Sequence, residues 1–313
     1  MNWIIDPKTI LAKFKRINID RPIFFVGNQG GGLTLISRMI RRHPSIVSIS
    51  GNHEYWTGAD EMQRVMVGRL PKTLSLSGKI INSDPKHNIY TLPRSWSYGV
   101  DDLIRAYHMT EESWNKKESE KLKRIIWEAI YRFSNNPSKA RFVDKSQSYT
   151  LKMRYIESIL EQTEPYFVLI TREPVAACYR AASGKAGDME RYSSKLNFDE
   201  RLDICIQHWY NCMSIALEDG KHLQHFQHFR FEDFLSEPEN SLNKMCNFID
   251  LSCDTDMIPQ PYHEIPFGTR YSKRWYPLKE DINEKYYKQI SDSHKDRILD
   301  KCASLANELG YNY

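Results

Sequence analysis

Residues 22–34 read Pro-Ile-Phe-Phe-Val-Gly-Asn-Gln-Gly-Gly-Gly-Leu-Thr, an apolar run that ends in a glycine-rich turn. A helical pattern of apolar residues follows at once, which predicts the order strand, turn and helix. Glycines allow consecutive backbone N–H groups to converge on an anion, and the start of a helix adds a partial positive charge. We therefore expect this stretch to be the phosphate-binding part of an α/β fold.

The spacing within the turn narrows the kind of phosphate compound. Gly27, Gly32 and Thr34 keep the G-x-x-x-x-G-x-T frame of a nucleotide P-loop, but Leu33 stands where an ATPase places its lysine. Leucine cannot contact phosphates as an ammonium group does, so a phosphate-bearing nucleotide is favoured over ATP hydrolysis. A tight turn without a ligand is the alternative. Three consecutive glycines are costly in conformational entropy, and such a turn needs only one or two.

Short apolar runs alternate with helical patterns along most of the chain. Strands are predicted at Ile23–Val26, Ile46–Ser50, Ala140–Val143, Tyr166–Thr171 and Phe226–Phe231. Helices are predicted at Thr34–Arg42, Glu118–Phe133, Tyr149–Gln162, Pro174–Ala182, Phe198–Asp219, Ser241–Ile249 and Asn283–Leu309. Strands separated by long helices pair in parallel, so we expect a single three-layer α/β/α domain over residues 1–313 with a central parallel sheet. Residues 58–115 are irregular, and we interpret them as a substrate-side insertion.

Composition limits the class of protein. The net charge is only +4, which argues against a nucleic-acid-binding surface and suits an anionic nucleotide or an acidic substrate. The six cysteines include no C-x-x-C pair, so neither a metal site nor a disulfide framework is suggested, and the reduced thiols of a cytoplasmic protein are the simplest account. Residues 1–21 are not signal-like, and no apolar run is long enough to span a bilayer, so we expect no integral membrane segment.

A second informative stretch is Tyr-Phe-Val-Leu-Ile-Thr-Arg-Glu-Pro, residues 166–174. The apolar strand delivers Arg172 at its carboxyl end, and Pro174 suits the first turn of a following helix. Ligands of open α/β sheets bind outside the carboxyl ends of the strands, where this guanidinium group could fork onto a phosphate. A surface salt bridge with Glu173 explains the position of the arginine equally well.

These two stretches and four further motifs, in the same order, resemble those of the sulfotransferases that use 3′-phosphoadenosine 5′-phosphosulfate (PAPS). The glycine loop resembles the family's 5′-phosphosulfate loop, and residues 171–174 resemble its "RDP" 3′-phosphate strand. The other motifs are His43-Pro44, Asp144-Lys145-Ser146 ("DKTP"), Arg230-Phe231-Glu232-Asp233-Phe234 with Glu237-Pro238 ("RYEDL…P") and the late basic loop at residues 268–275. The likeness covers most of the chain and is closer to carbohydrate-type, tyrosylprotein-type and bacterial members than to cytosolic phenol sulfotransferases.

The resemblance implies a P-loop-like sulfotransferase fold and a role for each motif. A sulfuryl group would pass in line from PAPS to an acceptor hydroxyl, without a metal ion, because fixed cations meet the leaving group. Loop amides would hold the 5′-phosphosulfate, basic side chains would clamp the 3′-phosphate, and an aromatic ring would face the adenine. The implied residues are Gln29, Gly30, Gly31, Gly32, Leu33 and Thr34 for the loop, Arg172, Arg180, Arg270, Lys273 and Arg274 for the clamp, and Phe231 (or Trp275) for the adenine, with core packing as the alternative for the ring.

Two positions depart from the family's pattern. Gly30 stands where the loop normally carries a lysine or arginine that neutralises the oxygen bridging sulfur and phosphorus. Losing such a donor costs about 3–4 kcal/mol of transition-state stabilisation. Lys145, Arg38 or Lys273 could substitute; otherwise the enzyme is slow, or the protein is a non-catalytic nucleotide-binding relative. Arg180 replaces a serine of the family, and could hold the 3′-phosphate more tightly.

Sulfuryl transfer also needs a base that takes the proton of the acceptor hydroxyl. His53 and Glu54 follow the second predicted strand, where carbohydrate-type relatives carry such a residue, and Tyr55 and Trp56 suit an acceptor ring. Histidine as a residue type titrates nearest to neutral pH, whereas glutamate needs desolvation, and the sequence does not choose between them. An ordinary loop with a buried aromatic anchor is the alternative. The expected acceptor is a carbohydrate or a small metabolite.

A P-loop kinase or NTPase is the competing class of enzyme. Asp144, directly after a predicted strand, would then be the aspartate that holds the metal ion. Leu33 and the absence of a second matching lysine argue against this class.

Overall fold

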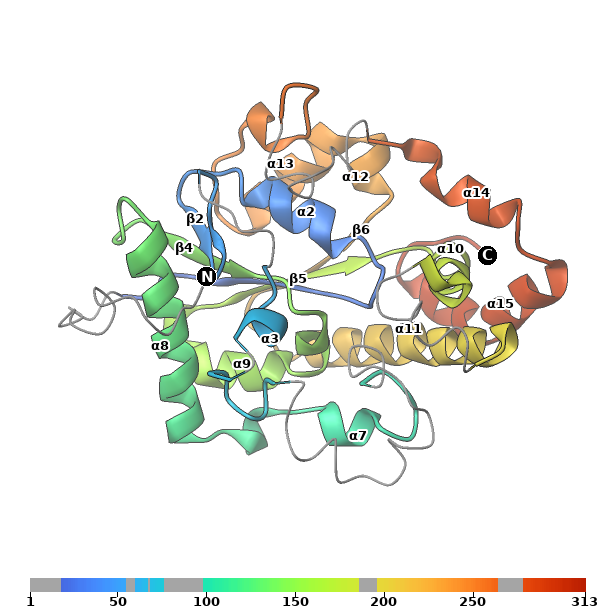
Figure 1. The fold of residues 1–313 in the computed structure, drawn as a ribbon, viewed down its shortest axis with the longest axis horizontal. Helices are drawn as coiled ribbons and strands as arrows, with labels where there is room; N and C mark the ends of the chain where they lie inside the picture. Colours follow the sequence, from blue (N-terminus) through green and yellow to red (C-terminus); the bar gives the residue numbers. More distant parts are fainter. Residues whose placement is uncertain (1–17, 55–59, 67, 76–97, 186–195, 264–277) are drawn as a thin grey trace.

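The computed structural model describes residues 18–54, 60–66, 68–75, 98–185, 196–263 and 278–313. A six-stranded sheet in the order β3-β2-β4-β1-β5-β6 forms its centre (Figure 1). The strands are β1 (Ile23–Val26), β2 (Ile46–Ser48), β3 (Gly51–Asn52), β4 (Arg141–Asp144), β5 (Tyr166–Thr171) and β6 (Phe226–Arg230). Only β2 and β3 pair in antiparallel fashion; the other neighbours are parallel. The predicted α/β fold is confirmed, with an antiparallel edge added to its parallel sheet.

Helices cover both faces of the sheet. They are α2 (Leu33–Ile40), α3 (Met62–Val65), α7 (Ile104–Tyr107), α8 (Lys116–Phe133), α9 (Met153–Leu160), α10 (Pro174–Arg180), α11 (Phe198–Gly220), α12 (Asp233–Ser236), α13 (Pro238–Phe248), α14 (Glu284–Tyr287) and α15 (Asp292–Glu308). Helices α2, α12 and α13 lie on one side of the sheet, and α8, α9 and α11 lie on the other (Figure 1).

The side chains of β1 show how the sheet joins two cores. Phe24 and Val26 pack into the core formed with α8, α9 and α11, whereas Ile23 and Phe25 pack into the core formed with α2 and α13. Successive residues of a strand point to opposite faces, so a strand covered on both sides is apolar at every position. This packing explains the uninterrupted apolar run that precedes the glycine loop.

Three element boundaries differ from those predicted. The second strand ends at Ser48, and the chain turns back into β3, with Gly51 at a φ of 131°. The helix predicted at 149–162 starts as a 3-10 turn, η2 (Gln147–Leu151), and becomes α9. The helix predicted at 283–309 is two helices, because Ser291 caps α15 by accepting a hydrogen bond from the His294 N–H.

The parallel strands place four chemically distinct segments at one edge of the sheet. Because β1, β4, β5 and β6 run in one direction, their carboxyl ends meet there. The glycine loop follows β1, Lys145 follows β4, Arg172 follows β5 and Phe231 follows β6. This is the edge at which α/β sheets bind ligands.

Candidate active site

The glycine loop is packed tightly against its neighbours. Gly27 has a φ of 151°, and a Cβ atom there would lie 2.4 Å from the Ile170 carbonyl oxygen. Gly32, the N-cap of α2, has a φ of 91°, and a Cβ atom there would lie 2.1 Å from a ring carbon of Phe231. The Thr150 hydroxyl accepts the Gly27 N–H at 2.7 Å and lies 2.9 Å from the Gly27 carbonyl oxygen. Both positions therefore need glycine, and helix α2 starts directly at the loop.

A cavity of about 500 Å³ opens beside the loop. The predicted donor-site residues that line it are Gly30, Gly31, Gly32, Leu33, Thr34, Arg172, Arg180 and Phe231. Gln29 does not line it, because its main-chain N–H is directed to the ring of His208 at 3.3 Å. Arg270, Lys273 and Arg274, like Tyr55, Trp56 and Trp275, lie outside the described residues. The structure thus gathers residues from three strand ends around one cavity.

Arg172 is fixed in the wall of this cavity by a neutral partner. Its Nε and Nη2 atoms donate to the Asn283 Oδ1 atom at 3.0 and 2.6 Å. The guanidinium carbon lies 5.1 Å from the centre of the Phe231 ring and 5.7 Å from that of Tyr286. Burial and the nearby Arg180 lower the pKa of Arg172. An anion bound in the cavity would offset both the burial of Arg172 and its repulsion by Arg180, because it would place a negative charge beside the two arginines.

A relay of part-buried hydrogen bonds supports Asn283 on the side away from Arg172. Its Nδ2 atom donates to Glu232 Oε1 at 2.7 Å, and the Tyr311 hydroxyl donates to Glu232 Oε2 at 3.1 Å. The Glu173 carboxylate instead caps α10, accepting the N–H groups of residues 175 and 176. Among the described residues no ion pair joins Arg172 to Glu173, so the salt-bridge interpretation of Arg172 is not supported.

The segment before α15 closes the cavity with residues that the sequence did not indicate. Leu278, Lys279, Ile282, Lys285 and Tyr286 line it, opposite the loop's contribution. The Lys285 ammonium lies 4.8 Å from the centre of the Tyr286 ring. Two lysines and an aromatic ring thus join Arg172, Arg180 and Phe231, a combination suited to a phosphorylated nucleoside.

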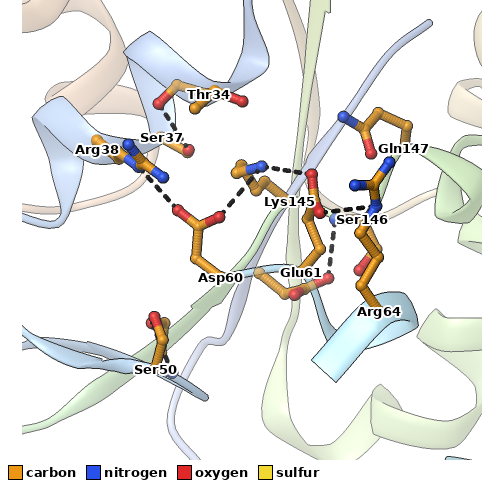
Figure 2. A network of polar contacts seen from close by, with 12 residues as sticks. Thr34, Ser37, Arg38, Ser50, Asp60, Glu61, Arg64, Lys145, Ser146 and Gln147 are labelled. Carbon is orange, nitrogen blue, oxygen red and sulfur yellow. Dashed lines mark hydrogen bonds and ion pairs between the residues drawn. The ribbon is translucent and has the colours of Figure 1, made fainter. Parts of the chain in front are cut away.

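On the other side of the loop, a buried carboxylate joins several cations (Figure 2). Asp60 lies 2.9 Å from Arg38 Nε, 3.3 Å from Arg41 Nη1 and 3.3 Å from Lys145 Nζ. Burial opposes ionisation of Asp60, but the three cations outweigh it and hold the pKa of the carboxyl group well below its usual range. Lys145 and Arg38, the predicted substitutes for a loop cation, are therefore ion-paired together around one aspartate.

Glu61 extends this network to Arg64. Lys145 Nζ also lies 2.8 Å from Glu61 Oε1, and Arg64 Nε lies 3.1 Å from Glu61 Oε2 (Figure 2). The next turn is bound to the wall of the cavity, because Gln63 Nε2 donates to Oε1 of the cavity residue Gln147 at 3.0 Å. The Glu61 side chain is 15% exposed, compared with 4% for Asp60.

Asp144 fastens this segment to the end of β4. Its carboxylate accepts the main-chain N–H groups of Met62 and Ser146, both at 2.9 Å. Burial raises the pKa of Asp144 to about 6. The aspartate of the kinase interpretation is thus occupied in holding Met62, the first residue of α3.

His53 and Glu54 do not lie with the glycine loop. Because β3 runs back along β2, with Asn52 paired to Val47, His53 is carried toward the amino ends of the parallel strands. It lies near His43, beyond the end of α2, whose first turn faces the cavity. The Glu54 side chain is 62% exposed, and neither residue lines the cavity. The turn at residues 49–50 reverses the chain before His53, so both candidate bases lie apart from the described cavity.

Two side-chain oxygens of the described glycine loop are buried without a hydrogen-bond partner. Among the described residues, Asn28 Oδ1 and Gln29 Oε1 make no hydrogen bond although both atoms are buried. Asn28 lines the cavity. Buried polar atoms are normally paired, so these two oxygens mark a site where water or a ligand belongs.

The residues that the structure describes contain no group of three or more His, Cys, Asp or Glu side chains placed to hold a metal ion. No helix in this part of the chain combines the length and apolar character needed to cross a membrane.

Comparisons with known proteins agree with this architecture. The sulfotransferase domain of the Synechococcus PCC 7002 olefin synthase matches with a TM-score of 0.50 at 14% identity, over 96% of this chain and 98% of that one. The sulfotransferase domain from the curacin biosynthetic pathway matches with a TM-score of 0.51 at 14% identity, over 91% and 98%. A search of curated proteins returned no match. A sequence model of the sulfotransferase family covers residues 22–256. The chain therefore belongs to the sulfotransferase family.

Proposed function

We propose that the protein transfers a sulfuryl group from PAPS to the hydroxyl group of a carbohydrate or a small metabolite. The observation that carries this proposal is the cavity shared by the glycine loop, Arg172, Arg180 and Phe231. Its volume of about 500 Å³ lies within the range of small-molecule sites. Membership of the sulfotransferase family supports PAPS over ATP, and it disfavours the kinase interpretation.

Each part of the donor has a matching group in the cavity. The amides of the loop and the first turn of α2 suit the 5′-phosphosulfate. Arg172 and Arg180 suit the 3′-phosphate, and the rings of Phe231 and Tyr286 suit the adenine. Lys279 and Lys285 add positive charge to the same cavity.

We assign the acceptor base to Glu61 in place of His53 or Glu54. Glu61, like His53 and Glu54, does not line the cavity, but it lies beside Lys145 at the carboxyl edge, one strand away from the loop, and retains some solvent access. In the reaction, the acceptor oxygen forms a bond to sulfur while the bond from sulfur to the bridging oxygen of the donor breaks. The acceptor proton passes to Glu61, whose carboxylate is held by Lys145 and Arg64.

Isothermal titration calorimetry with adenosine 3′,5′-bisphosphate tests donor recognition. We expect micromolar or tighter binding without magnesium, no comparable binding of ATP, and a loss of about 100-fold for Arg172→Ala, because a charged pair in a buried site is removed. ATP binding that requires magnesium would overturn the proposal. Transfer of labelled sulfate to a panel of sugars and phenols then separates an active enzyme from a relative that binds the nucleotide without turnover.

The cysteines bear on where the protein works. All six are free thiols, five of them buried. Disulfides persist mainly in oxidising compartments, so free thiols support the expectation of a reducing, cytoplasmic setting.

A further inference from the structure

Helix α11 contacts both halves of the donor site through two consecutive residues, His208 and Trp209, which are fully buried. The Gln29 main-chain N–H donates to His208 Nε2 at 3.3 Å. The Trp209 Nε1–H donates to the Arg172 carbonyl oxygen at 2.9 Å. One bond reaches the glycine loop after β1, and the other reaches the segment after β5.

The geometry of a helix explains how neighbouring residues reach two strands. Side chains of consecutive helical residues diverge by about 100°, and adjacent strands lie about 4.8 Å apart. Strands β1 and β5 are neighbours in the sheet, with Val26 paired to Leu169. A single turn of α11 below the sheet can therefore hold the ends of both strands (Figure 1).

The ring of His208 is held in one orientation. Tyr98 packs edge-on against it with ring centres 4.7 Å apart. A Cβ atom at Gly99 would lie 2.3 Å from His208 Nδ1, so the chain passes directly against the ring. Asn211 Nδ2 donates to the Gly99 carbonyl oxygen at 2.9 Å and keeps that segment on α11. Because Nε2 accepts the Gln29 N–H, it carries no proton in this arrangement.

We propose that His208 and Trp209 are positioning residues that set the distance between the loop amides and Arg172, and so select a nucleotide with phosphates on both the 5′ and the 3′ positions. The inference rests on the proposed function. A loop with three consecutive glycines loses much entropy when it is ordered, and a bond to a rigid helix lowers that loss before the ligand arrives.

Calorimetry with adenosine 3′,5′-bisphosphate, adenosine 5′-monophosphate and adenosine 3′-monophosphate tests the two bonds separately. His208→Leu should weaken the binding of adenosine 3′,5′-bisphosphate and of adenosine 5′-monophosphate about five- to tenfold, which corresponds to the loss of one hydrogen bond. The affinity for adenosine 3′-monophosphate should stay unchanged. Trp209→Phe should weaken the bisphosphate and the 3′-monophosphate and leave the 5′-monophosphate unchanged. His208→Gln, whose amide oxygen can accept the Gln29 N–H, should restore binding.

A role in general stability would lower the affinity for all three nucleotides together, and that result, or no change in any, would overturn the inference. Hydrogen exchange of the Gln29 amide gives a second measurement that needs no nucleotide. It should quicken in His208→Leu and return to the wild-type rate in His208→Gln. If the wild-type protein bound no nucleotide, the proposed function would fail, and unchanged exchange would still reject the positioning role. If Trp209→Phe does not fold, the comparison of His208→Leu with His208→Gln still tests the inference.

Discussion

The two sides of the glycine loop use the same kinds of charge in opposite ways. On the proposed donor side, Arg172 is held by the neutral amide of Asn283 and keeps its positive charge for the cavity. On the proposed acceptor side, Arg38, Arg41 and Lys145 converge on Asp60, so their charges are largely cancelled inside the protein. The comparison teaches that the partner of a buried cation decides whether it binds an anion or holds the structure together. Removing one partner at a time separates the two cases.

The largest effect is expected from Asp60→Ala. Losing the carboxylate that three buried cations share should lower the free energy of unfolding by about 3–5 kcal/mol, because charge in the interior is then less well compensated. Urea unfolding measures this change. Asp203→Ala, which removes a half-exposed ion pair with Arg297, is the matched control and should cost less than about 1 kcal/mol. Equal losses in the two variants would contradict the structural role of Asp60.

Acid should destabilise the fold through His228, which lies on the Arg172 side of the cavity. Burial and the nearby Arg230 lower the pKa of His228 to about 4, and its Nε2 lies 2.7 Å from the Thr171 hydroxyl, next to Arg172. The unfolded chain binds this proton more readily, so stability is full above the unfolded pKa of 6.5 and falls as the pH drops toward 4, by at most about 3 kcal/mol.

Unfolding measured at intervals from pH 7.5 to 4 checks this slope. His228→Gln should flatten it between pH 6.5 and 4, whereas His222→Gln, at an exposed position, should leave it as in the wild type. Asp60 stays ionised over this whole range. A slope that survives in His228→Gln would assign the acid sensitivity to another group.

Glu61→Gln tests the acceptor side as a place of chemistry. It should lower kcat about 100-fold, because a general base contributes at least that much, while the affinity for adenosine 3′,5′-bisphosphate stays unchanged. Steady-state transfer assays measure kcat, and calorimetry measures the affinity for adenosine 3′,5′-bisphosphate. Glu54→Gln is the matched control and should keep the wild-type kcat. A loss in Glu54→Gln and none in Glu61→Gln would restore the base predicted from the sequence.

The smallest effect is expected at Asn283. Asn283→Ala should weaken adenosine 3′,5′-bisphosphate about tenfold and leave adenosine 5′-monophosphate unchanged, because Arg172 then loses the two bonds that orient it. Asn240→Ala, which removes an exposed bond to Glu237, controls for loss of an asparagine. If both nucleotides weaken alike, Asn283 supports the fold rather than the 3′-phosphate site.

Local patterns were sufficient to predict five of the six strands and part of the lining of the cavity. Apolar runs indicated β1, β4 and β5 within one residue at each end, because strands covered on both faces leave a clear signal. Glycine spacing and an arginine after a strand then indicated the residues that line the cavity. Both signals depend only on what precedes and follows a strand.

The acceptor side could not be predicted because it depends on contacts between distant segments. Asp60 and Glu61 lie in a stretch interpreted as irregular, and contacts with Asp144, Lys145 and Gln147 bring that stretch to the sheet edge. His53 and Glu54 follow a strand, as a base should, but the short antiparallel β3 carries them away. No pattern in a single sequence indicates a two-residue strand. Asn283 was likewise missed, since its role exists only beside Arg172.

A crystal structure with adenosine 3′,5′-bisphosphate tests the central claim most directly. We predict the 5′-phosphate on the main-chain amides of the glycine loop, the 3′-phosphate on Arg172, and the adenine against Phe231. A nucleotide bound elsewhere, or one whose 3′-phosphate lies away from Arg172, would contradict the account.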